Sequence, residues 1–236
     1  MAAPLPDFLG LGTQKGGTTT LHRLLGKHPD VFLPACKEVH FFDQNYNSGE
    51  AWYREHFQAA RADQRCGDIT PFYLFHPDVP GRIHQHIPNA RLIVLLRDPV
   101  ERAISQVFHA QRLGFEPLPI DEALAAEQSR LATGDPYSFQ KHSYLSRSRY
   151  LEQLDRYEAL FPREQLLILR SEALFSDPQP QWERILEFLA LDRMPCPTLA
   201  PVYAGAGESQ SVPVALREQL RQQLVSTYRW MEEVLP

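Results

Sequence analysis

Residues 12–20, with the sequence GTQKGGTTT, bring glycines, a lysine and three threonines together in one short segment. Glycine lets the backbone approach a bound anion closely. The first N–H groups of a helix have no partner within the helix and carry partial positive charge. The hydroxyls of Thr18, Thr19 and Thr20 add donors, and Lys15 adds a full positive charge. This combination favours binding of phosphate or sulfate oxygens over a simple connecting turn with an exposed lysine.

The position of the lysine indicates which kind of anion binds. In the GxxxxGK[ST] loop of nucleoside triphosphatases, the lysine follows the last glycine. Here Lys15 precedes Gly16 and Gly17, and no magnesium-ligand pattern follows. The run QKGGTTTL, residues 14–21, resembles instead the 5′-phosphosulfate loop of sulfotransferases that use 3′-phosphoadenosine 5′-phosphosulfate (PAPS). By this resemblance Lys15, Gly16, Gly17 and the three threonines 18–20 bind the donor, and Lys15 also acts in catalysis.

A second pattern consists of Arg97, Pro99 and Ser105, which follow the apolar run 91–96. An arginine at the end of a strand and a hydroxyl one turn into the next helix can converge on one phosphate. The pattern resembles the second motif of the same family, in which these residues hold the 3′-phosphate of the nucleotide. Taken alone, Arg97 could also form a surface ion pair with Asp98 at a helix start.

The acceptor side is indicated by KEVHFFD, residues 37–43, which resembles a segment of carbohydrate sulfotransferases of the heparan-sulfate type. Transfer to a hydroxyl needs a group that takes its proton. Glu38 is the first candidate for this base, and His40 either orients the acceptor or is the base itself. Lys37 and Asp43 are candidate acceptor contacts. The alternative is a structural role, in which Glu38 pairs with Lys37 and His40 packs beside the two phenylalanines.

Thr70 lies in DITPFY, residues 68–73, which resembles the Thr-Pro segment that lines the acceptor cleft of the family. Heparan-type enzymes commonly have a lysine one or two residues before this threonine, where this chain has Asp68 and Ile69. This departure, with a formal net charge of −5, argues against a highly anionic polysaccharide as the acceptor.

Two further segments concern the nucleotide. Arg149 and Tyr150 resemble the start of the family's helix that closes over the nucleotide, although a helix-surface arginine and a core tyrosine would look similar. The family's basic C-terminal loop is replaced by YAGAGE, residues 203–208, which has no basic residue.

The elements that must position these residues alternate along the chain. Apolar runs predict strands at 6–12, 31–34, 66–71, 91–96 and 166–169. Apolar residues at helical spacing predict helices from Thr18 to about Leu25, at 50–60, through 104–108, at 150–161, around 182–189 and at 214–234. The alternation predicts an α/β fold with a doubly wound parallel sheet and a P-loop-like phosphate loop. We expect one domain over residues 1–236.

Composition limits the remaining possibilities. The chain has 236 residues, 43% of them hydrophobic and 22% charged, which is typical of a soluble globular protein. The net charge argues against a nucleic-acid partner, and no apolar stretch is long enough to span a bilayer. The three cysteines are scattered, so we expect neither a disulfide framework nor a metal site. The N-terminus lacks the pattern of a signal peptide, so we expect a cytoplasmic location.

The sequence therefore predicts an enzyme that transfers a sulfuryl group from PAPS to a hydroxyl or amine of a carbohydrate or small-molecule acceptor, without a metal, releasing 3′-phosphoadenosine 5′-phosphate (PAP). One alternative is a non-catalytic module that binds the 3′,5′-bisphosphate and could dispense with Glu38. A P-loop kinase is a further alternative, but it would need a magnesium-binding Ser or Thr after the loop lysine and an acidic strand end, and neither pattern is found. The sequence leaves the acceptor and the oligomeric state open.

Overall fold

The computed structural model describes residues 3–198 and 208–235. The chain divides into two compact units. The sheet unit contains residues 1–96 and 153–202, and the helical unit contains residues 97–152 and 203–236. The single domain predicted for residues 1–236 stays a prediction.

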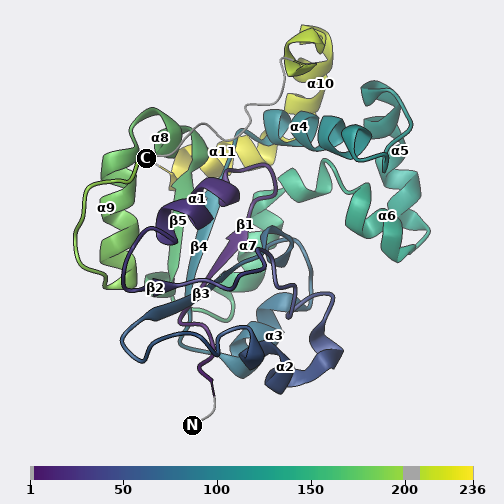
Figure 1. The fold of residues 1–236 in the computed structure, drawn as a ribbon. Coiled ribbons are helices and arrows are strands. Elements are labelled where there is room, and N and C mark those ends of the chain that lie inside the picture. Colours follow the sequence, from purple (N-terminus) through teal and green to yellow (C-terminus); the bar gives the residue numbers. More distant parts are fainter. Residues whose placement is uncertain (1–2, 199–207, 236) are drawn as a thin grey trace. The chain divides into compact units, whose positions relative to one another are not determined.

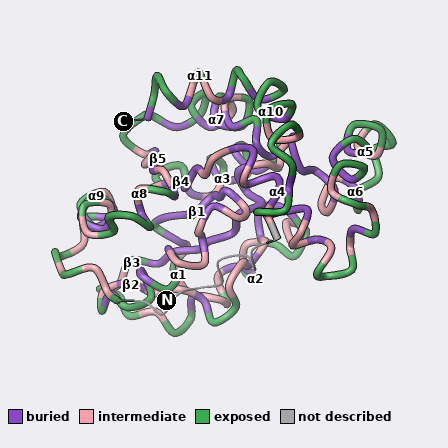
Figure 2. Tube along the Cα trace, turned by 90° about the horizontal axis from the view of Figure 1, so that it is seen from above, coloured by how far each residue is buried: buried purple, intermediate pink, exposed green. Residues whose placement is uncertain are grey.

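The sheet unit is built on five parallel strands in the order β2-β3-β1-β4-β5 (Figure 1). The strands are β1 (Phe8–Gly12), β2 (Val31–Phe32), β3 (Arg65–Ile69), β4 (Arg91–Leu96) and β5 (Leu166–Arg170). Every residue of β1 is buried, and Figure 2 shows β1 and β4 in the colour of buried residues. Burial on both faces is what a central parallel strand requires. The predicted parallel sheet is confirmed.

Helices of the sheet unit cover the sheet with apolar stripes. They are α1 (Thr18–Leu25), α2 (Gly49–Glu55), α3 (Val79–His86), α7 (Tyr150–Glu158, in this unit from Gln153), α8 (Ser171–Ser176) and α9 (Pro178–Leu189). Leu21 and Leu25 of α1 and Trp182 of α9 belong to one buried cluster with side chains of β1, β3, β4 and β5. Elsewhere in the unit, Tyr157 of α7 donates a hydrogen bond to the carbonyl of Tyr73, 2.7 Å away.

The strand order creates a switch point between the neighbours β1 and β4. The chain leaves β1 toward the β2 edge of the sheet, and it leaves β4 toward the β5 edge. In open α/β sheets, ligands bind at the carboxyl ends of strands at such a point. The predicted phosphate loop follows β1 directly, and Arg97 is the residue after the last residue of β4.

The helical unit packs around α4 (Pro99–Arg112). Its other helices are α5 (Ile120–Ala132), α6 (Pro136–Lys141), α10 (Val214–Gln223) and α11 (Val225–Val234). Ile104 and Val107 of α4 share a buried cluster with Leu124 of α5 and Leu220 of α10. The apolar pattern had not indicated α5 or α6.

The single helix predicted at 214–234 is wrong, because two helices meet at Leu224. The buried residues of the two helices and of the break are Leu220, Leu224, Thr227 and Met231. Their spacing is helical throughout, so the sequence pattern continues across the break and does not reveal it.

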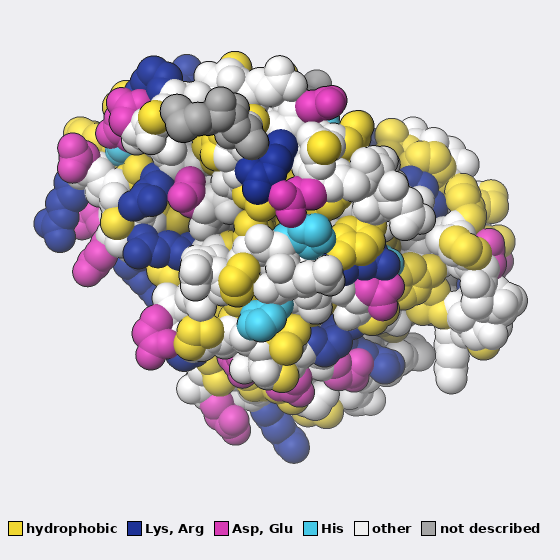
Figure 3. All heavy atoms as spheres, turned by 90° about the horizontal axis from the view of Figure 1, so that it is seen from below, with side chains coloured by type: hydrophobic (Ala, Val, Ile, Leu, Met, Phe, Trp, Pro, Cys, Tyr) yellow, Lys and Arg dark blue, Asp and Glu magenta, His cyan; other side chains and the backbone are white. Residues whose placement is uncertain are grey.

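The surface shows no concentration of one charge in the view of Figure 3, where basic and acidic side chains are interspersed. Across residues 3–198 and 208–235, no helix is both long and apolar enough to cross a lipid bilayer. The same ranges contain no group of three or more His, Cys, Asp or Glu side chains that could hold a metal ion.

Candidate active site

The phosphate loop, residues 13–17, is fastened to its neighbours in the sheet unit. The N–H and the hydroxyl of Thr13 both donate to the carbonyl of Leu95 in β4, at 2.7 and 3.1 Å. The hydroxyl of Ser171, the first residue of α8, donates to the carbonyl of Gly16. The loop is therefore held both by β4 and by the helix that follows β5.

The two central glycines of the loop are required by its geometry. A Cβ atom at Gly16 would lie 2.4 Å from the hydroxyl oxygen of Thr13 and 2.8 Å from the carbonyl oxygen of Leu95. Gly17 has φ of 94°, in the left-handed region that favours glycine. A side chain at Gly16 would therefore collide with Thr13 and Leu95, and the loop can keep this path only with glycine there.

The N-terminus of α1 supplies the donors. The first hydrogen bonds of the helix run from the N–H groups of Thr20 and Leu21 to the carbonyl of Gly17, at 2.9 and 3.1 Å. The N–H groups of Thr18 and Thr19 precede them and lie at the positive end of the helix dipole. This donor set fits an anionic group such as a phosphate or sulfate.

Backbone strain is concentrated at the predicted catalytic residues. Lys15, Glu38 and His40 have φ of 68°, 67° and 58°, and in the described ranges Ala190 is the other non-glycine residue in this region. Ala190 follows the last residue of α9, where a left-handed residue commonly ends a helix. Such backbone costs about 1–3 kcal/mol per residue and is concentrated at functional sites.

The acceptor segment, residues 37–43, is anchored by its two phenylalanines. Phe41 and Phe42 are fully buried, and the ring of Phe41 stacks on that of Tyr53 with 4.3 Å between centroids. Glu38 and His40 are left partly accessible, with 35% and 24% of their side chains exposed. The predicted catalytic pair is therefore carried by an anchored segment, and both side chains remain partly accessible to a reactant.

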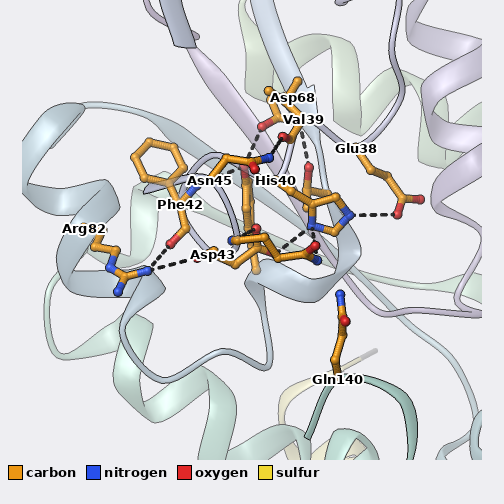
Figure 4. A network of polar contacts seen from close by, with 12 residues as sticks. Glu38, Val39, His40, Phe42, Asp43, Asn45, Asp68, Arg82 and Gln140 are labelled. Atoms are coloured by element: carbon orange, nitrogen blue, oxygen red, sulfur yellow. Dashed lines mark hydrogen bonds and ion pairs between the residues drawn. The ribbon is translucent and has the colours of Figure 1, made fainter. Parts of the chain in front are cut away.

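The polar side chains of this segment form a chain of contacts (Figure 4). Nε2 of His40 lies 3.6 Å from Oε2 of Glu38, and its Nδ1 lies 2.8 Å from Oδ2 of Asp43. Lys37 donates a hydrogen bond from Nζ to the other oxygen of Glu38. The sequence analysis considered a structural role in which Glu38 pairs with Lys37. In the structure, Glu38 makes this pair and also contacts His40.

These contacts set the charges of the two candidate bases. Burial opposes the charge on His40, but the hydrogen bond to Asp43 and the ion pair with Glu38 raise the pKa of His40 to about 9. Burial also opposes ionisation of Glu38, yet the ion pair with His40 and the charge of Lys37 lower the pKa of Glu38 to about 2. At neutral pH, Glu38 is a carboxylate that can accept a proton and His40 is an imidazolium that cannot.

Behind the segment lies Asp68, which is buried and collects four donors. Its carboxylate accepts hydrogen bonds from Tyr53 at 3.0 Å, Tyr73 at 2.8 Å and Thr70 at 2.8 Å, and from the N–H of Val39. Burial raises the pKa of Asp68, although these hydrogen bonds lower it. Val39 lies between Glu38 and His40, so Asp68 fixes the backbone that carries both.

The contacts of Asp68 change the roles assigned to Thr70 and to Asp68 itself. Thr70, predicted to contact the acceptor, is fully buried and donates its hydroxyl to Asp68. Asp68 had been noted only as the place where a lysine is absent. An acidic residue within the run of buried residues that ends β3 is the sequence signal that could have identified its supporting role.

Arg82 of α3 is a second support that sequence reasoning missed. Its Nη1 donates to the carbonyls of Phe42 and Asp43, at 2.8 and 3.3 Å (Figure 4). Its guanidinium group also lies over the ring of Tyr46, 4.4 Å from the centroid. The end of the acceptor segment is held by these contacts.

The helical unit contains the other predicted nucleotide contacts. Tyr150 is fully buried and donates its hydroxyl to the carbonyl of Arg97, 2.9 Å away, so it fixes the backbone of that residue. Asp98 caps α4 by accepting from the N–H of Glu101 at 2.9 Å. Ser105 is partly buried and lies in the second turn of α4.

Two further nucleotide contacts stay predictions. Arg149 has a largely exposed side chain, 3.9 Å from the carboxylate of Glu152. The segment 203–207, which stands where the family has a basic loop, lies outside the described residues.

Comparison with known families identifies the domain. A family model described as "Sulfotransferase domain" matches residues 5–195. The chain belongs to the sulfotransferase family. The phosphate loop and the Arg97 motif of this sulfotransferase both lie within the matched range, and the predicted family is confirmed.

Human relatives of this sulfotransferase include two heparan sulfate glucosamine 3-O-sulfotransferases. Heparan sulfate glucosamine 3-O-sulfotransferase 3B1 is 35% identical over 191 residues, which are 80% of this chain and 47% of the relative. Heparan sulfate glucosamine 3-O-sulfotransferase 6 is 36% identical over 190 residues, 80% of this chain and 53% of the relative. The chain thus spans about half the length of these curated relatives.

A solved structure extends the similarity to the whole fold. The sulfotransferase from Alicyclobacillus acidocaldarius superimposes with a TM-score of 0.84 at 28% identity, over 99% of this chain and 96% of that one. The predicted fold class is confirmed.

Proposed function

We propose that this sulfotransferase moves a sulfuryl group from PAPS to a hydroxyl of a carbohydrate acceptor. The observation that carries the proposal is the position of the Glu38 carboxylate, which lies between Lys37 and His40 in a chain of this family. These two contacts lower the pKa of Glu38 to about 2, which leaves it ionised at neutral pH. A general base must be unprotonated and accessible, and Glu38 meets both conditions.

The donor is held by residues that suit its charges. Lys15, the backbone of Gly16 and Gly17 and the threonines 18–20 bind the 5′-phosphosulfate, and Arg97 and Ser105 bind the 3′-phosphate. PAPS supplies the sulfuryl group, and PAP is the product. The fit rests on the N-terminus of α1, where the N–H groups of Thr18 and Thr19 precede the first hydrogen bonds of the helix.

The chain's own residues then act on the proton and on the developing charge. Lys15 and the loop N–H groups neutralise charge on the departing phosphate oxygen. Glu38 takes the proton of the acceptor hydroxyl as its oxygen bonds to sulfur. Because the pKa of Glu38 is about 2, this proton moves as the O–S bond forms and not before. His40, itself held by Asp43, keeps the Glu38 carboxylate in place. Thr70 donates a hydrogen bond to Asp68, which in turn fixes the backbone between Glu38 and His40.

The acceptor class is inferred from the names of the relatives and from a local difference between this chain and related enzymes. The human relatives are named for heparan sulfate glucosamine, which favours a carbohydrate. In this chain the two positions at which related enzymes commonly have a lysine are Asp68 and Ile69, which are both buried, and the net charge is −5. A carbohydrate of low charge density therefore fits better than a polyanion. The cytoplasmic location stays a prediction, to be tested by fractionating the source cells.

Ligand-induced thermal shifts and a transfer assay test the proposal. Adenosine 3′,5′-bisphosphate at about 100 times its Kd should stabilise the protein by ~2.7 kcal/mol. A shift with ATP and magnesium but none with the bisphosphate would support a kinase and refute the proposal. Labelled PAPS with a panel of neutral and anionic sugars then separates an enzyme from a binding module. Glu38→Gln should keep the bisphosphate shift and lose transfer.

A further inference from the structure

A surface cavity of about 620 Å³ lies beside α1 in the sheet unit. Cavities of roughly 300–1,000 Å³ are the usual size of small-molecule sites. The cavity forms where the end of α1 approaches β2 and the residue after it, since a Cβ atom built at Gly26 would lie 3.9 Å from Cδ1 of Leu33. The phosphate loop and the acceptor segment contain none of its lining residues.

The lining of this cavity combines cations with hydrocarbon. The helix α1 and the residues just after it supply His22, Arg23 and Lys27. The strand β2 and the next residue supply Val31, Phe32 and Leu33. The remaining described residues of the lining are uncharged. A cavity with basic side chains along one element and apolar side chains along the other fits a group that is itself apolar and carries a negative charge.

His22 brings an unpaired polar atom to this cavity. Its Nε2 is shielded from solvent and has no hydrogen-bond partner among the described residues. Buried polar atoms without a partner are uncommon in native structures, so an atom of this kind in a cavity indicates a contact that a ligand supplies. Arg23 and Lys27 are exposed and place further donors and positive charge beside it.

The cavity lies next to the acceptor segment. Burial lowers the pKa of His22, the charge of Lys37 lowers it further, and the charge of Glu38 raises it. Both charged groups therefore lie close enough to act on the imidazole. Along α1, His22 follows Thr19 of the loop threonines by one turn, and residues at this spacing share a helix face. An acceptor whose hydroxyl reaches Glu38 can thus extend past His22 into the cavity.

We propose that the cavity is an acceptor subsite for an apolar group that carries one anionic substituent, attached to the sugar that receives the sulfuryl group. Nε2 of His22 donates a hydrogen bond to the anion, while Arg23 and Lys27 neutralise its charge. Phe32 and Leu33 pack on the apolar part. The chemical class of the acceptor is then a glycoside with an anionic, apolar aglycone. The inference rests on the proposed function in taking the acceptor to be a sugar.

Calorimetric titration of the full chain, saturated with adenosine 3′,5′-bisphosphate, tests the subsite. The probes are 4-carboxyphenyl β-D-glucoside and its uncharged counterpart, 4-carbamoylphenyl β-D-glucoside. The wild type should bind the carboxylate roughly tenfold more tightly, the effect of one hydrogen bond to a charged group. The double variant Arg23→Gln/Lys27→Gln should lose this preference and bind the uncharged glucoside as the wild type does. The preference of the wild type should also shrink as salt is added.

His22→Leu separates ligand binding from folding. It removes the unpaired Nε2, so it should weaken binding of the carboxylate while the thermal stability is kept, because no partner within the described residues is left behind. A variant that loses stability but binds the carboxylate normally would show that His22 only supports the fold, and the subsite as proposed would be wrong.

Arg184→Gln is the matched control, because it removes the same charge from an exposed position of α9. It should keep the full preference for the carboxylate. Equal affinity of the wild type for the two glucosides, no binding of either, or an equal loss of preference in Arg184→Gln and the double variant would overturn the subsite. Transfer from labelled PAPS is scored separately. A protein that prefers the carboxylate but sulfates no sugar would keep the subsite and refute the proposed function.

Discussion

Nδ1 of His40 lies 2.8 Å from Oδ2 of Asp43, a carboxylate whose side chain is completely shielded from solvent. A shielded carboxylate needs a partner that carries positive charge or donates a hydrogen bond. On its other side His40 faces Glu38. The imidazole is therefore held between two carboxylates, which stabilises its protonated form and assigns it a supporting role.

This relationship predicts the pH dependence of transfer. With Glu38 as the base, kcat/KM should be constant from well above the Glu38 pKa of about 2 up to the His40 pKa of about 9, and then fall as the imidazolium is lost. Steady-state rates from about pH 5 to about pH 10 measure this profile. A rate that climbs tenfold per pH unit toward pH 9 would instead identify His40 as the base.

Stability should depend on pH through the same two residues. The pKa of His40 is raised in the folded state, so its stabilising effect is complete below its ordinary value of 6.5 and is lost as pH rises through about 9. The pKa of Glu38 is lowered, so its effect is present above 4.5 and is lost as pH falls through about 2. Urea unfolding of wild type and His40→Gln should differ most near pH 6 and converge above about pH 9. A gap that stays constant over this range would contradict the charge assignment.

Lys15→Ala should lower kcat by ~10²–10³-fold, the usual effect of removing one group that stabilises transition-state charge. Arg184→Ala, which removes an exposed basic residue of α9, is the control and should leave kcat unchanged. Single-turnover transfer from labelled PAPS makes the comparison. Near-wild-type turnover in Lys15→Ala would exclude this residue from catalysis.

Gly16→Ala should disrupt the loop, because the new methyl group would meet the hydroxyl oxygen of Thr13 at 2.4 Å and the carbonyl oxygen of Leu95 at 2.8 Å. We expect a loss of bisphosphate affinity of at least about tenfold, together with ~1–3 kcal/mol of destabilisation. Gly81→Ala in α3 is the control, since nothing lies within 4 Å of its Cβ position. It should stabilise the protein by ~0.5–1 kcal/mol and leave affinity unchanged. Equal affinities in the two variants would mean that the loop does not bind the nucleotide.

Asp68→Asn tests the support behind the acceptor segment. An amide has one accepting oxygen where the carboxylate has two, so at least one donor among Tyr53, Tyr73, Thr70 and the Val39 N–H loses its partner. We expect a loss of ~1–3 kcal/mol in unfolding free energy. The kcat should fall while bisphosphate binding is kept, because the backbone between Glu38 and His40 is released. Asp63→Asn, at an exposed site, should change neither quantity. Parallel losses of kcat and nucleotide affinity would indicate a general folding defect instead.

The sequence by itself determined the elements whose causes are local. A run such as 91–96, apolar at successive positions, can only be buried on both faces, and it forms β4 as expected. The glycines, lysine and threonines of residues 12–20 indicate an anion loop because donors at a helix start depend on neighbours in the chain. The same local reasoning misread residues 214–234, where the apolar spacing continues through a break at Leu224.

Only the tertiary structure decided what the polar residues do. The charges of Glu38 and His40 depend on how deeply Asp43 is buried, and the role of Asp68 depends on Tyr53 and Tyr73 reaching it from other elements. The contact between Ser171 and Gly16 joins residues 155 positions apart. Burial and long-range contacts follow from the path of the whole chain, so no local pattern can encode them, and they are what set pKa values and align donors with a ligand.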